Sequence, residues 1–276
     1  MSSRPGLAAG LRRVVAGLAV VLLTLVAVPA SGSPSGSGHR PKPTVVLVHG
    51  AFADASSWSE VVLRLQRKGY PVLAPANPLR GVAADSAYLA SVLGTISGPV
   101  VLVGHSYGGV VITNAATGNA NVKALVYVAA FVPDAGDTVG GLQVKYPGTK
   151  LGQAALDVRE FPLAGGGVSH EGYVKPALFR DIFAGDLPPA EAALLAATQR
   201  PADVHTLDQP SGEPAWRTIP SWTLIARDDN LIPAAAQRFM AARAHARAVE
   251  VNASHVAMIS KPSATVDLVV DAATHR

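Results

Sequence analysis

Short, mostly apolar runs recur along the chain, and segments with apolar residues at helical spacing separate them. Branched side chains and flanking Gly or Pro residues favour buried strands for the runs, which lie at 44–48, 70–74, 99–103, 122–131, 222–226 and 248–251. The intervening segments are predicted as helices, at 55–68, 85–93, 110–116, 234–244 and 262–273. Strands that alternate with helices predict an α/β fold, with a mostly parallel sheet and helices on both of its faces.

The alternation is interrupted between about residues 132 and 220. This stretch contains the triplet Gly165-Gly166-Gly167 and short amphipathic segments at 176–183 and 189–199. We expect it to form a helical cap that is inserted into a single α/β domain spanning residues 44–276.

The first 30 residues have a different pattern. Arg12 and Arg13 precede an uncharged, mostly apolar run at 14–28, and small residues follow it. This order is typical of a secretory signal peptide, and the run is short for a membrane span, which needs about 20 apolar residues. We therefore expect residues 1–30 to be a signal peptide and residues 31–43 to be a flexible linker, so that the domain is secreted without stable membrane association. An uncleaved N-terminal anchor is the alternative.

Composition narrows the function by exclusion. The formal net charge is +4, but residues 1–30 carry only basic charges, and the remainder is nearly neutral. Because there is no basic run and only 5% of the residues are aromatic, we expect no nucleic-acid partner. The sequence has no Cys, which excludes disulfides and cysteine nucleophiles, and it has no zinc or phosphate-loop pattern. We therefore expect no cofactor and no metal.

The segment Gly104-His105-Ser106-Tyr107-Gly108 matches the pattern G-x-S-x-G. It follows a predicted strand directly and opens a predicted helix, which is the context that a nucleophile elbow requires. The two glycines permit close approach of the backbone, and the helix N-terminus favours negative charge nearby. Ser106 is therefore the candidate nucleophile; an ordinary turn between strand and helix is the alternative.

A serine hydroxyl needs a base to take its proton, and that base must be close in space. Of the eight histidines, His255 lies in the loop after the last predicted strand, where this architecture returns a side chain over the serine. A carboxylate should orient the imidazole, and Asp228 and Asp229 both follow the penultimate strand. Either of them satisfies the chain order serine, acid, histidine.

Backbone donors for a negatively charged oxygen are expected in two places. The first predicted strand ends in His49-Gly50-Ala51-Phe52, a loop that can supply one N–H group. Tyr107, the residue after the candidate nucleophile, would supply the second. An ordinary glycine turn is the alternative interpretation of the loop.

With these residues in view, the chain after the linker resembles the α/β-hydrolase superfamily. It is most similar to the branch that contains plant methyl esterases, hydroxynitrile lyases and small bacterial carboxylesterases, including pyrethroid hydrolases. The resemblance rests on His49-Gly50-Ala51-Phe52 with Trp58, Gly104-His105-Ser106-Tyr107-Gly108-Gly109, Asp229-x-x-Ile232-Pro233, and Ser254-His255. It implies an α/β-hydrolase fold, Asp229 rather than Asp228 as the acid, and Ala51 as the loop donor.

The resemblance also implies a serine hydrolase that cleaves a small apolar carboxylic ester through an acyl-enzyme. Hydroxynitrile lyase activity is one alternative, but such lyases carry a hydroxylated residue at the position of Gly50 and a Lys at that of Val256. A ligand-binding protein on a hydrolase fold is another. For the substrate pocket we expect Phe52, with candidate aromatic residues from the cap, namely Tyr146, Tyr173, Phe179, Phe183 and Trp216.

Overall fold

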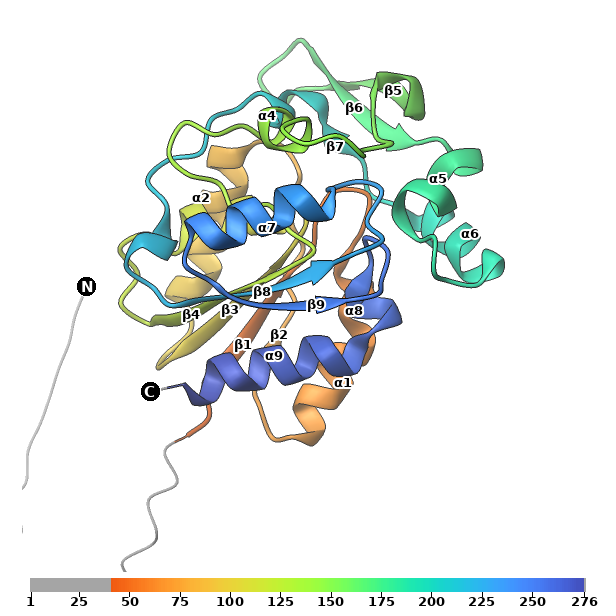
Figure 1. Ribbon diagram of the computed structural model, residues 1–276. Helices are drawn as coiled ribbons and strands as arrows, with labels where there is room; N and C mark the ends of the chain where they lie inside the picture. The colour runs from red at the N-terminus through yellow and green to blue at the C-terminus, as the bar shows by residue number, and fades with distance from the viewer. Residues whose placement is uncertain (1–40, 276) are drawn as a thin grey trace, which may run out of the picture. The chain divides into compact units, whose positions relative to one another are not determined.

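A six-stranded parallel sheet forms the centre of the domain (Figure 1). The computed structural model describes residues 41–275, so the predicted signal peptide and most of the predicted linker lie outside the described residues. The strand order is β2-β1-β3-β4-β8-β9, and each neighbouring pair is parallel. The strands are β1 (Thr44–Val48), β2 (Val72–Leu73), β3 (Val100–His105), β4 (Val122–Val128), β8 (Ser221–Ala226) and β9 (Arg247–Val251). This arrangement confirms the predicted mostly parallel sheet.

Helices cover both faces of this sheet, as the alternating pattern predicts. On one face α1 packs against α9, and on the other α2 packs against α3, while α7 packs on β8 (Figure 1). The bounds are η1 (Ala55–Trp58), α1 (Ser59–Arg67), α2 (Val82–Gly94), α3 (Gly108–Ala115), α7 (Ala234–Arg243), α8 (Ala257–Ser260) and α9 (Pro262–Thr274). Because helices cover both faces, every residue of β3 and β8 is buried. This explains why these strands are continuous apolar runs rather than alternating ones.

The fourth strand is shorter than its apolar run. The run continues to Phe131, but β4 ends at Val128 because Ala129 has a φ of 44° and turns the chain out of the sheet. Phe131 nevertheless stays buried, and its N–H donates to the Ser106 carbonyl at 3.2 Å. Burial therefore extends beyond the strand, and hydrophobicity alone cannot mark where the ladder of hydrogen bonds stops.

The chain between β4 and β8 forms a cap of mixed structure rather than a helical one. The segments predicted at 176–183 and 189–199 are helical, but residues 156–174 form a β-hairpin in a three-stranded antiparallel sheet of order β5-β6-β7. Gly166 and Gly167, with φ of 90° and 84°, lie in the connection between β5 and β6. The cap contains α4 (Val139–Gln143), η2 (Gln153–Ala155), β5 (Leu156–Pro162), β6 (Val168–Val174), α5 (Pro176–Phe183), α6 (Pro189–Thr198), β7 (Ala202–Asp203), η3 (Val204–Leu207) and η4 (Ala215–Arg217).

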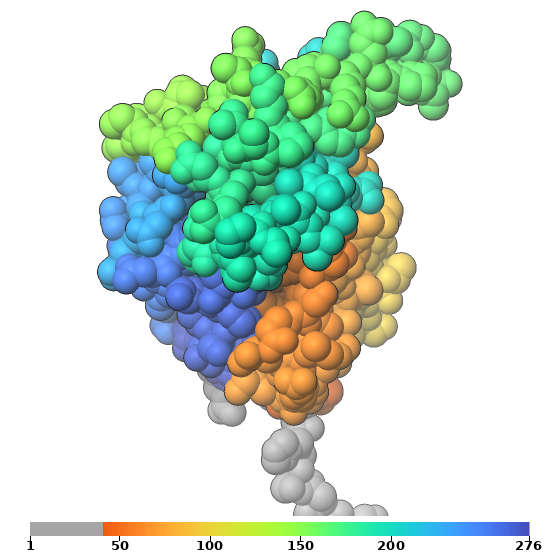
Figure 2. All heavy atoms as spheres, turned by 90° about the vertical axis from the view of Figure 1, so that its right-hand side faces the viewer, coloured from red at the N-terminus to blue at the C-terminus, as the bar shows by residue number. Residues whose placement is uncertain are grey.

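The sequence does not predict this hairpin, because β5 is poorly buried. Its residues are partly or fully exposed, and it includes the charged residues Arg159 and Glu160. Such an edge strand lacks the continuous apolar run that marks the central strands. Figure 2 shows the cap, coloured green to cyan, covering one end of the domain. Within residues 41–275 no helix is long and apolar enough to cross a membrane.

Candidate active site

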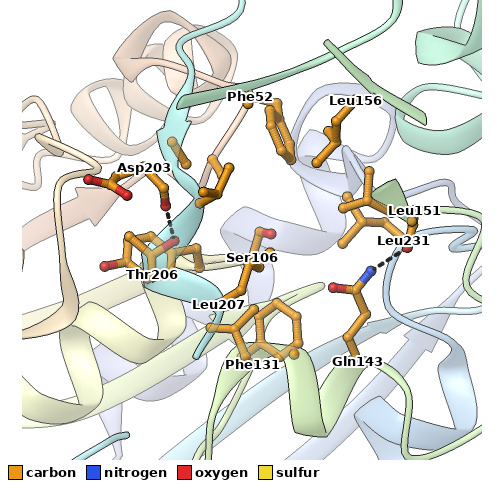
Figure 3. A pocket seen from close by; sticks show the side chains of 18 of the residues that line it. Phe52, Ser106, Phe131, Gln143, Leu151, Leu156, Asp203, Thr206, Leu207 and Leu231 are labelled. Atoms are coloured by element: carbon orange, nitrogen blue, oxygen red, sulfur yellow. Dashed lines mark hydrogen bonds between the residues drawn. The ribbon is translucent and has the colours of Figure 1, made fainter. Parts of the chain in front are cut away.

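Ser106 occupies a strained turn between β3 and α3. Its φ is 53°, in the left-handed region, which costs a non-glycine residue about 1–3 kcal/mol. The flanking glycines are needed because a Cβ on Gly104 would lie 2.6 Å from the Gly108 carbonyl oxygen, and a Cβ on Gly108 would collide with the Val48 carbonyl oxygen. The turn exposes the Ser106 side chain to a pocket (Figure 3). This is the local geometry that the G-x-S-x-G pattern predicts.

Asp229 and His255 form a buried pair. The Asp229 Oδ2 and His255 Nδ1 atoms are 2.8 Å apart, and both side chains have no exposed surface. Asp229 lies in the turn after β8, and His255 lies between β9 and α8. The pairing assigns the proton to Nδ1, which leaves the lone pair on Nε2.

The carboxylate of Asp229 is held by three further donors. Its Oδ1 accepts from the backbone N–H groups of Leu231 and Ile232 at 2.8 and 2.9 Å, and its Oδ2 accepts from Gln237 Nε2 at 2.9 Å. These bonds fix the direction in which the carboxylate meets the imidazole. Asp228, by contrast, is exposed. The structure thus brings Asp229, and not Asp228, to His255.

His255 Nε2 is buried, and no protein atom of residues 41–275 is bonded to it. No hydrogen bond joins Ser106 Oγ to it among those residues either, although such contacts are often long in enzymes without substrate. A hydrogen bond through His105 joins the turn after β3 to the loop after β9, because His105 Nε2 lies 3.0 Å from the His255 carbonyl oxygen. Burial, and then the neighbouring His255, hold the pKa of His105 well below its usual value, so His105 is neutral and donates from Nε2.

The loop after β1 passes directly against the elbow. A Cβ on Gly50 would lie 2.6 Å from Ser106 Cβ and 3.2 Å from Ser106 Oγ, so only glycine fits. The next residue, Ala51, lines the same pocket as Ser106 and Tyr107. Within the described part of the chain, the N–H groups of Ala51 and Tyr107 donate no hydrogen bond, whereas that of Phe52 donates to the Arg200 carbonyl at 2.9 Å. Two uncommitted donors therefore lie beside Ser106.

His49 holds this loop in place. Its Nδ1 lies 2.9 Å from the Gly50 carbonyl oxygen, and its Nε2 accepts from the Asn77 N–H at 2.9 Å. Burial lowers the pKa of His49, which keeps the ring neutral and able to accept at Nε2. Both ring nitrogens of His49 therefore make contacts that hold the loop in place.

Tyr107 is also anchored, through a contact that the sequence analysis missed. Its hydroxyl donates to Asp85 Oδ2 at 2.8 Å, and Asp85 is fully buried on α2. Asp85 also accepts from the Arg80 N–H at 3.1 Å. Burial raises the pKa of the Asp85 carboxyl and of the Tyr107 phenol. No sequence pattern pointed to Asp85, because its helix shows only ordinary amphipathic spacing.

The pocket over Ser106 is a cavity of about 220 Å³ with mostly apolar walls (Figure 3). Phe52 lines it, as predicted, but none of the five candidate cap aromatics does. Phe183, for example, packs against the His255 ring at a centroid distance of 5.0 Å. The walls are instead built from residues that no pattern marked as pocket residues, including Phe131, Val139, Gln143, Leu151, Leu156, Asp203, Thr206, Leu207 and Leu231. Among residues 41–275, no cluster of His, Asp and Glu side chains is placed to hold a metal ion.

Comparisons with known proteins assign the chain to a family. The model of the alpha/beta hydrolase family matches residues 45–268. A carbendazim hydrolyzing esterase of a Nocardioides species is 37% identical over 113 residues, which are 36% of this chain and 47% of that protein. A pyrethroid hydrolase of Sphingobium wenxiniae is 28% identical over 248 residues, 82% of this chain and 86% of that protein.

A solved structure has the same fold. The crystal structure of polyneuridine aldehyde esterase superposes with a TM-score of 0.70 at 20% identity, covering 83% of this chain and 98% of that one. At this level of identity the likeness shows the fold alone. The family match over most of the described domain, with relatives that are named as an esterase and a pyrethroid hydrolase, leads to one conclusion: the chain belongs to the alpha/beta hydrolase family and is a carboxylesterase-like hydrolase.

Proposed function

We propose that this protein is a secreted serine hydrolase that cleaves a carboxylic ester through an acyl-enzyme, with Ser106, His255 and Asp229 as its catalytic triad. The observation that carries the proposal is the buried Asp229–His255 pair, in which His255 Nε2 has no partner within residues 41–275. The His255 ring lies 4.7 Å from the ring of His105, the residue before the strained Ser106. A buried polar atom without a hydrogen-bond partner destabilises the folded protein. During turnover, His255 Nε2 would accept the proton of the Ser106 hydroxyl.

In the first half of the reaction, Ser106 Oγ attacks the carbonyl carbon of the ester while His255 Nε2 takes the hydroxyl proton. The carbonyl oxygen becomes negatively charged and accepts hydrogen bonds from the N–H groups of Ala51 and Tyr107. When the tetrahedral intermediate collapses, the bond to the alcohol oxygen breaks. His255 gives its proton to the departing alcohol, and the acyl group stays on Ser106.

In the second half, water replaces the alcohol. His255 Nε2 takes a proton from the water, whose oxygen attacks the acyl carbon, and the same two N–H groups bind the oxyanion. Collapse returns the proton to Ser106 Oγ and releases the carboxylic acid. Throughout the reaction, Asp229 holds the imidazole in the tautomer that has a free Nε2.

The substrate that this pocket favours is a compact, mostly apolar ester. A cavity of about 220 Å³ lies below the usual range of about 300–1,000 Å³ for small-molecule sites. Relatives of this chain are named for hydrolysis of carbendazim and of pyrethroids, which supports an apolar substrate. We extend the class, but not the individual compounds, to this chain.

The lyase alternative is disfavoured by the loop after β1. A hydroxylated side chain at position 50 would place its Cβ 2.6 Å from Ser106 Cβ, so the backbone here is built for glycine. At the other position of interest, Val256 is fully buried and apolar. Neither position offers the polar group that the lyases of this branch carry.

Substitution of Ser106 tests the proposal. We expect Ser106→Ala to lower kcat for an activated aryl ester by about 10⁶-fold, while circular dichroism shows an unchanged fold. A folded Ser106→Ala protein that retained a tenth of the activity would overturn the assignment.

The secretion part of the proposal has its own test. N-terminal sequencing should show that the exported protein begins near residue 31, and an intact N-terminus on membrane-bound protein would contradict secretion.

A further inference from the structure

One polar side chain in the apolar pocket is buried and only half satisfied. Gln143, the last residue of α4, is 6% exposed and lines the cavity. Its Nε2 donates to Thr149 Oγ1 and to the Leu151 carbonyl oxygen, both at 3.0 Å. A carbonyl oxygen can only accept, so the contact with Leu151 fixes which end of the amide is nitrogen.

The other end of the amide faces the cavity. Gln143 Oε1 accepts no hydrogen bond from any residue between 41 and 275. Figure 3 shows this oxygen on the side of Ser106 and Phe131, while the nitrogen points to Leu151. Oε1 keeps accessible surface in the cavity, so a ligand that brings a hydrogen-bond donor can reach it. A ligand that fills the cavity without such a donor would leave this acceptor unpaired.

Apart from Ser106, the proposed nucleophile, the other buried polar side chains of the pocket have protein partners. The Tyr107 hydroxyl donates to Asp85, and Thr206 Oγ1 donates to the Asp203 carbonyl oxygen at 2.8 Å. The Asp203 carboxylate accepts from Ser169 Oγ at 2.9 Å and lies 2.9 Å from His205 Nδ1. Apart from Ser106 Oγ, Gln143 Oε1 is therefore the one side-chain oxygen without a hydrogen-bond partner among the buried residues that line this cavity within the described chain.

We propose that Gln143 is a specificity-determining residue, and that the substrate is a mostly apolar ester carrying an uncharged hydroxyl or N–H group that donates to Gln143 Oε1. An ammonium group does not suit the site, because one neutral acceptor cannot offset the desolvation of a charge. The inference rests on the proposed ester hydrolysis and adds to it the chemistry of the substrate.

Matched pairs of esters test this inference. One set consists of the methyl esters of 2-, 3- and 4-hydroxyphenylacetic acid with their methoxy analogues, which place the donor on the acyl side. The other set consists of the corresponding hydroxyphenethyl and methoxyphenethyl acetates, which place it on the alcohol side. We expect Gln143→Met to lower the hydroxy-to-methoxy ratio of kcat/KM by about tenfold for at least one pair, relative to the wild type. A ratio that stays within twofold for every pair would overturn the inference.

Two controls separate recognition from packing. Thr149→Val removes one partner of Gln143 Nε2 but leaves Oε1 in place, so it should keep the wild-type ratio; an equal fall in this variant would show that loop packing, not the acceptor, causes the effect. Gln153→Met changes an exposed residue on the rim of the same cavity and should also keep the ratio.

A binding measurement makes the inference independent of turnover. In Ser106→Ala protein, calorimetry should show that adding Gln143→Met weakens binding of the preferred hydroxy ester about tenfold, and that of its methoxy analogue less than twofold. Equal weakening for both esters would contradict the inference. Failure of the wild type to hydrolyse any ester would instead count against the proposed function, and the binding arm would still decide the role of Gln143.

Discussion

The proposed reaction centre and the wall of its pocket are built in different ways. Ser106, Asp229 and His255 follow the ends of β3, β8 and β9, so the hydrogen-bond ladder of the central sheet fixes their spacing. The wall comes largely from the cap, a separate three-stranded sheet with short helices. Because the two regions are built separately, the reaction and its selectivity should respond to different substitutions. Changes at the strand ends should slow the hydrolysis of every ester, whereas changes in the cap should alter the preference among esters.

Two ion pairs join the cap to the rest of the domain. Arg80 Nη2 lies 2.8 Å from Glu171 Oε2 on β6, and Arg243 Nη2 on α7 lies 2.6 Å from Asp137 Oδ2. All four side chains keep some exposure to solvent, and exposed ion pairs contribute about 0–1 kcal/mol each. These two ion pairs therefore add little to the stability of the cap.

After loss of the nucleophile itself, the largest effect should come from the acid at the end of β8. Asp229→Asn leaves the shape of the site intact but no longer favours the tautomer with a free His255 Nε2, so kcat should fall by about 10⁴-fold. Asp228→Asn is the matched control and should change kcat only a few-fold, because Asp228 is exposed and does not contact the imidazole. Steady-state kinetics of both variants with one activated ester decide the point; a severe Asp228 variant would reverse the two roles.

A steric change at the oxyanion loop should have the next largest effect. Gly50→Ala would force its Cβ against Ser106, 2.6 Å from Ser106 Cβ, and a displacement of about 1 Å at a reacting atom costs about 100-fold. Gly152→Ala, where an added Cβ meets nothing within 4 Å, is the control and should retain most of the activity. If Gly50→Ala hydrolysed esters at the wild-type rate, the loop would not constrain the nucleophile.

Filling the pocket from the cap should change preference rather than abolish the reaction. Leu156→Trp on β5 narrows the cavity, so kcat/KM should fall about 10–200-fold for bulky acyl esters and much less for acetates. Val158→Trp on the same strand, at a position that is 52% exposed, should leave the preference unaltered. A series of aryl esters of increasing acyl length measures both. A uniform loss over the whole series would mean that the cap and the reaction centre are not separable.

The smallest effect concerns stability. Tyr107→Phe removes the hydroxyl that donates to Asp85 and leaves a fully buried carboxyl with one donor fewer. The free energy of unfolding should fall by about 1–3 kcal/mol, measured by urea denaturation. The backbone N–H of Tyr107 is unaffected, so activity should change much less than in Gly50→Ala. No loss of stability would show that the contact contributes little.

Local sequence patterns mark the residues that follow the central strands, but they do not mark the residues that line the pocket. The position of Ser106 between an apolar strand and a helix follows from local pattern, and loops after parallel strands meet at one edge of a sheet. The choice of Asp229 over Asp228 required the resemblance to a family, because both residues follow the same strand. In the structure, Asp229 alone of the two contacts His255.

The cap lacks such local signals. The strand β5 is partly exposed and charged, so its pattern does not stand out from a loop. Gln143 and Leu207 reach the pocket through tertiary packing of α4 and η3, and nothing in their own neighbourhood in the sequence marks them. The five aromatic residues of the cap, Phe183 among them, are candidates for the pocket because of their residue type, yet none of them lines the cavity. Residue type alone therefore does not predict a pocket wall.

The central claim is that an acyl group resides on Ser106 during turnover. Rapid quenching after mixing the protein with p-nitrophenyl butyrate, followed by intact and peptide mass spectrometry, tests it most directly. The account predicts a burst of one nitrophenol per protein molecule and a butyryl adduct on the peptide that contains Ser106, with no adduct in Ser106→Ala. Steady hydrolysis with no adduct on that peptide, or an adduct on another residue that persists in Ser106→Ala, would contradict the claim.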